Sequence, residues 1–202
     1  MADIAAPHFI GESIVALLRA RRSLLAESDQ LGPVPATQDI AHVPVAKLTS
    51  ATPPTSGLSL TCYHIARSEH AQAVTPGRSS ADGVGVSLEL YYLLASWAAT
   101  ASEELALISW AMLELGRYPV LGPGQLLGGG WARDESIQIV PGTDSPEQLG
   151  RIWESFKSKY RLSTTFRARI VRIGYGRTED GPPVIASRFS FAAGDVALEP
   201  SL

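Results

Sequence analysis

The 202-residue sequence contains a single cysteine, Cys62. One thiol cannot form an internal disulfide, so the fold does not depend on an oxidising compartment. The sequence also lacks a set of cysteines and histidines with zinc-finger spacing. The histidines His8, His42, His64 and His70 are not separated by the four residues of a helical metal site, and no carboxylate motif accompanies them. We therefore expect neither a metal nor another cofactor.

An excess of basic charge and a long apolar run are missing as well. With 17 Lys and Arg against 20 Asp and Glu, the formal net charge is −3, so no broad basic field exists to attract nucleic acid or anionic lipid. The longest apolar stretch, 90–101, is interrupted by Ser96 and Thr100 and falls short of the roughly 20 residues of a membrane helix. Residues 1–4 lack the pattern of a signal peptide. We expect a protein that starts in the cytoplasm and binds neither nucleic acid nor a membrane.

What the sequence does contain is an ordinary globular composition. Apolar residues make up 45% and charged residues 18%, which excludes disorder over the whole length. The length is close to that of one domain. We expect a domain over 1–175 that buries a real core and a C-terminal arm over 176–202.

Three segments have the apolar spacing of amphipathic helices. They are 9–25, with Ile10, Ile14, Leu17, Leu18 and Leu25; 100–115, with Leu105, Ile108, Met112 and Leu115; and 145–156, with Leu149, Ile152, Trp153 and Phe156. The second and third begin with capping-box patterns, formed by Thr100 with Glu103 and by Ser145 with Gln148. The second helix is expected to cover the central strand.

Alternating or continuous apolar segments predict the strands. They are 40–45 as a short edge strand, 58–65, 86–97, 136–140, 164–170 and 184–191. The run 86–97 is apolar on both sides, which predicts a central strand covered on each face. The order of these elements predicts an α+β fold, in which a mixed β-sheet is flanked by about three helices and followed by an extended C-terminal arm.

No group of residues has the pattern of a catalytic site. Cys62 and His64 would share one strand face, but nothing nearby in the sequence orients them, so a core cysteine is the simpler interpretation. Glu89 could pair with Glu103 and Glu104, yet these two lie in the first turn of a helix, where negative charge is favourable anyway. The glycine-rich segment 122–130 has neither a P-loop nor a dinucleotide-binding pattern and is interpreted as a loop.

Three segments of the second half resemble the tail-terminator, or cap, family of extracellular contractile injection systems. They are LELYYLLASWA (88–98), EELALISWAMLELGRYPVLG (103–122) and SPEQLGRIWESFKSKYRLSTTFRARIVRI (145–173). The family's order of features occurs here as Tyr92-Leu93-Leu94, Pro119-Val120-Leu121, Leu149 with Trp153, and Tyr160-Arg161-Leu162-Ser163. The resemblance covers roughly residues 9–175.

The resemblance implies a structural protein and not an enzyme. In that family six copies form a ring at the end of the inner tube opposite the baseplate, where the ring halts tube growth and anchors the last sheath layer. The partners implied are further copies of the chain, the inner tube protein and the sheath protein. Assembly is expected in the cytoplasm, within a particle that can be released.

The C-terminal arm is expected to dock onto another chain. Glycines and prolines over 174–183 form a hinge, and the apolar residues beyond it are Val184, Ile185, Phe189 and Phe191. We expect this segment to add a strand to a sheet edge in the next ring subunit or in the last sheath layer. The alternative is an edge strand within its own domain.

Other functions remain open at the level of sequence. They are a terminator of an ordinary phage tail, a baseplate adaptor, a monomeric peptide-binding adaptor and, with the least support, an enzyme that uses Cys62.

Overall fold

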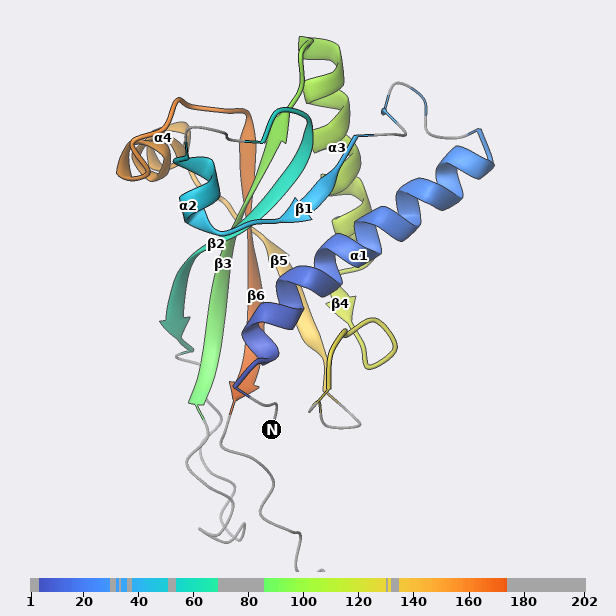
Figure 1. Ribbon diagram of the computed structural model, residues 1–202. Helices are drawn as coiled ribbons and strands as arrows, with labels where there is room; N and C mark the ends of the chain where they lie inside the picture. The colour runs from blue at the N-terminus through green and yellow to red at the C-terminus, as the bar shows by residue number, and fades with distance from the viewer. Residues whose placement is uncertain are drawn as a thin grey trace, which may run out of the picture.

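The structure is a computed structural model that describes residues 4–29, 32, 34–35, 38–50, 54–68, 86–129, 131 and 135–173. In chain order its elements are α1 (Ala6–Glu27), β1 (Ile40–His42), α2 (Val45–Leu48), β2 (Gly57–Arg67), β3 (Val86–Trp97), α3 (Ala101–Arg117), β4 (Val120–Leu121), β5 (Ile137–Pro141), α4 (Pro146–Ser155) and β6 (Ser163–Ile173). The predicted α+β class with a mixed sheet is confirmed (Figure 1).

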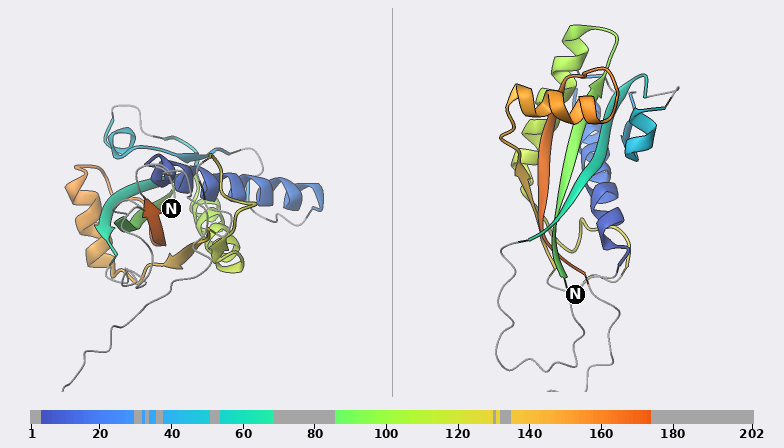
Figure 2. Two further views of the ribbon diagram at one scale, coloured as in Figure 1. Left: turned by 90° about the horizontal axis from the view of Figure 1, so that it is seen from below. Right: turned by 90° about the vertical axis from the view of Figure 1, so that its left-hand side faces the viewer.

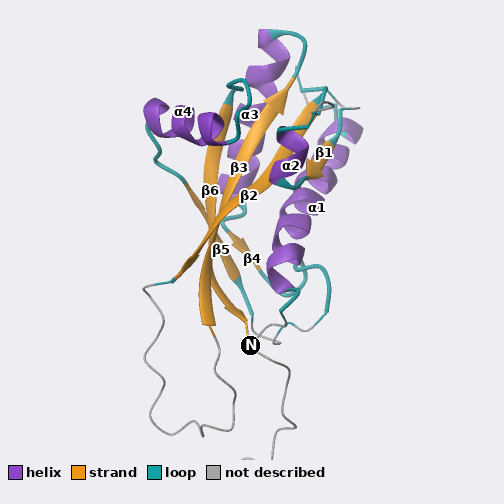
Figure 3. Ribbon diagram, turned by 60° about the vertical axis from the view of Figure 1, so that its left-hand side comes forward, coloured by secondary structure: helices purple, strands orange, loops and turns teal. Residues whose placement is uncertain are grey.

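The strands form one six-stranded sheet in the order β1-β2-β3-β6-β5-β4. The edge pair β1 and β2 is parallel, and every other neighbouring pair is antiparallel. The long strands β2, β3 and β6 twist strongly across one another (Figure 3), as the right-handed twist of strands dictates. β3 lies between β2 and β6 in the interior of the sheet, so the prediction of a central strand at 86–97 is confirmed.

Helices cover both faces of this sheet because β3 presents apolar side chains on both sides. Tyr92 and Leu94 of β3 belong to the main core cluster, which α1 and α3 cover. Leu93 and Trp97 belong to a second cluster, which Trp153 of α4 completes together with α2. In Figure 2, right, α2 and α4 lie on the near side of the strands and α1 and α3 behind them. Alternation along one strand therefore sets the positions of all four described helices.

The predicted capping box is confirmed in full at α4, and at α3 the predicted bond to the Thr100 side chain is present. Thr100 Oγ1 accepts a hydrogen bond from the backbone N–H of Glu103, which caps α3. At α4 the N–H of Gln148 donates to Ser145 Oγ, and the Gln148 side chain accepts from the N–H of Ser145, a complete capping box. Each bond satisfies a backbone donor that a helix start leaves without an intrahelical partner.

The shortest elements, α2 and β4, were not predicted. They contain four and two residues. Such segments are too short for a helical or strand period to be visible in the sequence. The predicted strand at 184–191 lies outside the described residues.

Trp153→Ala is expected to destabilise the protein by about 3–5 kcal/mol, the usual cost of truncating a buried aromatic side chain. The Trp153 side chain is buried, its Nε1–H donates to Ser163 Oγ at 2.9 Å, and its ring meets the edge of Trp97. The measurement is chemical denaturation followed by circular dichroism.

Tyr160→Ala is the matched control, because Tyr160 touches the same tryptophan ring but is exposed. Its cost should be well below that of Trp153→Ala. A folded Trp153→Ala protein with nearly unchanged stability would show that this aromatic cluster does not hold the second face of the sheet.

Candidate interaction surface and polar clusters

The outer face of α3 is apolar and carries no charge along its middle. Leu105, Met112 and Leu113 are 57%, 45% and 55% exposed, and Ser109 and Gly116 are exposed with them, while the exposed Arg117 ends the helix. An exposed helix face normally carries charged side chains, and a contiguous apolar one indicates an interaction site.

The exposed side of α3 differs from the one predicted from the sequence. The prediction placed Leu105 and Met112 in the core with Ile108 and Leu115. Ile108 and Leu115 are buried, but Leu105 and Met112 are not, so the prediction is wrong for these two. The side chains that replace them in the core are Leu107, Trp110 and Ala111. Apolar residues lie on both the buried and the exposed side of α3, so the helical period alone did not single out the buried side.

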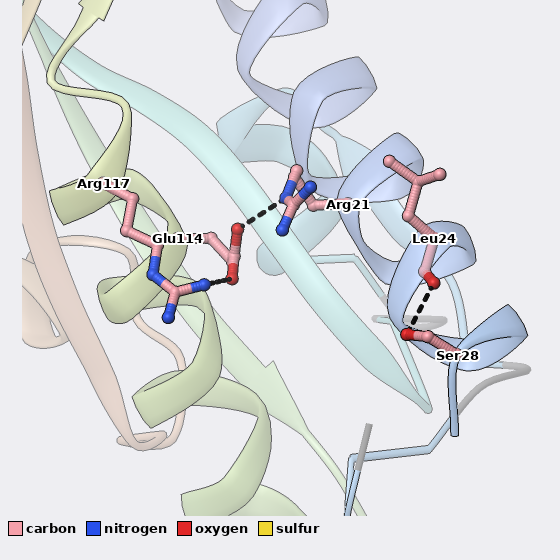
Figure 4. Close-up of polar contacts among 5 residues, drawn as sticks. All are labelled: Arg21, Leu24, Ser28, Glu114 and Arg117. Atoms are coloured by element: carbon pink, nitrogen blue, oxygen red, sulfur yellow. Dashed lines mark hydrogen bonds and ion pairs between the residues drawn. The ribbon is translucent and has the colours of Figure 1, made fainter. Parts of the chain in front are cut away.

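A buried carboxylate holds α3 against α1. Glu114 is 1% exposed, and its two oxygens are bonded to Arg21 Nε of α1 at 2.9 Å and to Arg117 of α3 at 3.3 Å (Figure 4). The hydrogen bond to Glu114 raises the pKa of Arg21. The Arg21 guanidinium also lies over the ring of Tyr118. These contacts fix the orientation of α3 and hence of its apolar outer face.

Three potential metal ligands meet where α1 passes β1. His8 and Glu12 lie on α1, His42 lies on β1, and one donor atom from each lies within 4.8 Å of the others. Nδ1 of His42 is 3.2 Å from Glu12 Oε1, and the two imidazole rings are 5.8 Å apart. Burial lowers the pKa of His42, which favours its neutral form.

Sequence reasoning missed this cluster. The helical spacing of four was tested only between histidines, and it joins His8 to the carboxylate of Glu12. The third residue, His42, follows Glu12 after 30 positions and reaches the pair only through the fold.

Cys62 and His64 do not form a catalytic pair in the described geometry. A register shift lies between them in β2, so their spacing no longer places both on one strand face. Cys62 is half-buried against the main core, and its thiol contacts the backbone carbonyl of His64. The ring of His64 lies against Tyr91 instead. Burial raises the pKa of Cys62, so the unreactive thiol is the favoured form.

The three glutamates considered as catalytic carboxylates occupy positions that the fold explains. Glu103 and Glu104 are in the first turn of α3, as expected. Glu89 is buried on β3, where the hydroxyls of Ser68 and Tyr91 donate to it and Arg169 Nε lies 3.4 Å away. Each carboxylate thus has a structural reason for its position.

The apolar residues of the predicted arm, Val184, Ile185, Phe189 and Phe191, lie outside the described residues, as does the boundary at 175–176. Among the helices that the structure describes, none has the length and apolar character needed to cross a bilayer.

Two solved structures are similar to this chain. A cryo-EM structure of an extracellular contractile injection system, a PVC sheath/tube terminator in the extended state, shares 16% identity with a TM-score of 0.56, over 94% of this chain and 64% of that chain. This likeness shows a common fold, and the chain spans just under two thirds of the matched protein. The anti-feeding prophage cap, a tube-terminating cap, matches at 16% identity over 66% of this chain and 48% of that chain, with a TM-score of 0.43. No curated protein matches.

A match to a family model shows to which protein family the chain belongs. The model of the Pvc16 N-terminal domain matches residues 10–187, which include α1 from Ile10 onward, the whole of α3 and the six described strands. The tail-terminator resemblance predicted from the sequence is confirmed by this match. The chain therefore belongs to the Pvc16 N-terminal domain family.

Proposed function

We propose that this chain is the cap subunit that ends the inner tube of a contractile injection particle. The match to the Pvc16 N-terminal domain over residues 10–187 carries the proposal. The fold shared with a sheath/tube terminator supports it. The role is structural and not enzymatic, with assembly in the cytoplasm before any release of the particle.

Six copies form a closed ring, and the outer face of α3 contributes to the contact between neighbouring copies. Permanent interfaces between identical subunits are more apolar than ordinary surface. Leu105, Met112 and Leu113 supply such a surface on a helix that Glu114 holds in place. Because a six-membered ring is heterologous, this face meets a different surface of the next subunit.

The ring binds the last inner-tube layer and anchors the last sheath layer. For the sheath we propose strand addition by the arm, through Val184, Ile185, Phe189 and Phe191. Main-chain hydrogen bonds to an open sheet edge provide affinity in such contacts, while alternate side chains provide specificity.

Deleting this protein is expected to give tubes and sheaths of uncontrolled length, or no assembled particles, because nothing then halts tube growth. Electron microscopy of particles from the deletion strain measures the length distribution. Reintroducing the intact gene should restore it. Particles of normal length from the deletion strain would contradict the proposed function.

The pair Leu105→Glu and Leu113→Glu is expected to abolish ring formation without unfolding the monomer. Both side chains are exposed, and exposed substitutions usually change stability by less than about 0.5 kcal/mol. A charge in an apolar contact is strongly unfavourable. Native mass spectrometry measures the oligomer, with Leu24→Glu on the exposed side of α1 as control. Rings that form normally from the double variant would remove the α3 face from the interface.

Truncation after Gly176 is expected to leave the melting temperature of the isolated monomer unchanged while ring closure or sheath attachment fails, because the arm docks on another chain. Calorimetry and electron microscopy provide the two readouts. A truncated monomer that melts several degrees lower would show that the arm belongs to its own fold.

A further inference from the structure

The cluster of His8, Glu12 and His42 has the chemistry of a transition-metal site. Two imidazoles and one carboxylate make the set N, N, O, which occurs in sites for Zn²⁺ with three protein ligands. Ligands at about 2.0–2.1 Å around a tetrahedral ion lie roughly 3.4 Å from one another. The donor atoms of the cluster lie within 4.8 Å of each other, and the pair His42 and Glu12 is already at 3.2 Å. Closing the remaining distance requires a movement of His8, whose side chain is exposed.

Two of the three ligands are held in place by the fold. His42 is paired with Leu60 in the parallel ladder of β1 and β2, and the backbone N–H of Val43 donates to Leu60 O at 2.9 Å. The imidazole of His42 meets the ring of Tyr92 at its edge. The carboxylate of Glu12 comes from the second turn of α1, one turn after His8.

The helix residue beneath His42 is a glycine, which brings the imidazole close to the helix backbone. A Cβ atom at Gly11 would lie 2.4 Å from the ring of His42, so no larger residue fits there without displacing the imidazole. The backbone at position 11 is helical, a conformation that any residue can adopt, so the backbone itself does not require a glycine there. A glycine is needed at this position because α1 passes close to β1. The same close approach places His42 beside Glu12.

We propose that His8, Glu12 and His42 bind one divalent transition-metal ion, for which Zn²⁺ is the best match. The three side chains leave a fourth tetrahedral position for water. Mg²⁺ and Ca²⁺ are disfavoured because they prefer sets of oxygen ligands. The bound ion joins the start of α1 to the edge strand β1. Its ligands Glu12 and His42 are 30 positions apart in the sequence.

The experiment measures binding of Zn²⁺, and separately of Ca²⁺, to the purified full chain by isothermal titration calorimetry, with metal content determined after dialysis. The variants are His8→Ala, which changes an exposed side chain, and Glu12→Gln, which keeps the shape of the residue. His64→Ala is the control, because His64 is an exposed histidine outside the cluster. Circular dichroism of the metal-free proteins establishes that all of them fold.

One equivalent of Zn²⁺ is expected to bind to the unchanged protein and to His64→Ala, and to raise their melting temperatures. His8→Ala and Glu12→Gln should each weaken binding at least tenfold, because even changes behind a ligand cost about 10–100-fold in metal affinity. Equal Zn²⁺ affinity in all four proteins, no binding at all, or Ca²⁺ binding of similar strength would overturn the proposal. The measurement uses the isolated chain, so its outcome is independent of the proposed role in a particle.

Discussion

The two-sided burial of β3 is the constraint on which the rest of the structure depends. Its alternate side chains enter two different cores, so each face of the sheet must be covered. On one face α1 and α3 provide the large core, and on the other Trp153 of α4 and Leu48 of α2 close a smaller one. With helices on both faces and most strands paired antiparallel, the body is an α+β layer structure.

This arrangement determines which surfaces remain for partners. α3 uses Leu107, Trp110 and Leu115 for the core, which leaves a second apolar stripe facing outward. Glu114 lies between Arg21 and Arg117 and ties that helix to α1. An exposed apolar stripe on a fixed helix is suited to a permanent contact, whereas the same side chains on a mobile loop would lose conformational entropy on binding. Two catalytic candidates, Glu89 and Cys62, instead contact structural partners, namely the hydroxyl of Ser68 and the backbone carbonyl of His64.

The cluster of His8, Glu12 and His42 is not explained by the proposed role of the chain as a cap subunit. It lies where α1 meets the parallel edge pair β1 and β2, with the ring of His42 against Tyr92 of the central strand. A metal ion bound there would stiffen the edge strand β1, because it would tie this strand to α1. Edge strands are the parts of a sheet most available to other chains, so stiffening one affects the surface presented to a neighbour.

The sequence by itself determined the class of the fold, the central strand at 86–97, the helix starts at Thr100 and Ser145, and the burial of Trp153. These depend on local periods and on caps that involve residues close in the chain, so a linear pattern carries them. The tertiary structure alone decided which stripe of α3 faces the core, because Leu105 and Ile108 are equally apolar and only the packing partner distinguishes them. It also decided the pairing of Arg21 with Glu114 across 93 positions and the meeting of His42 with Glu12, since contacts between distant segments follow from the sheet that brings them together.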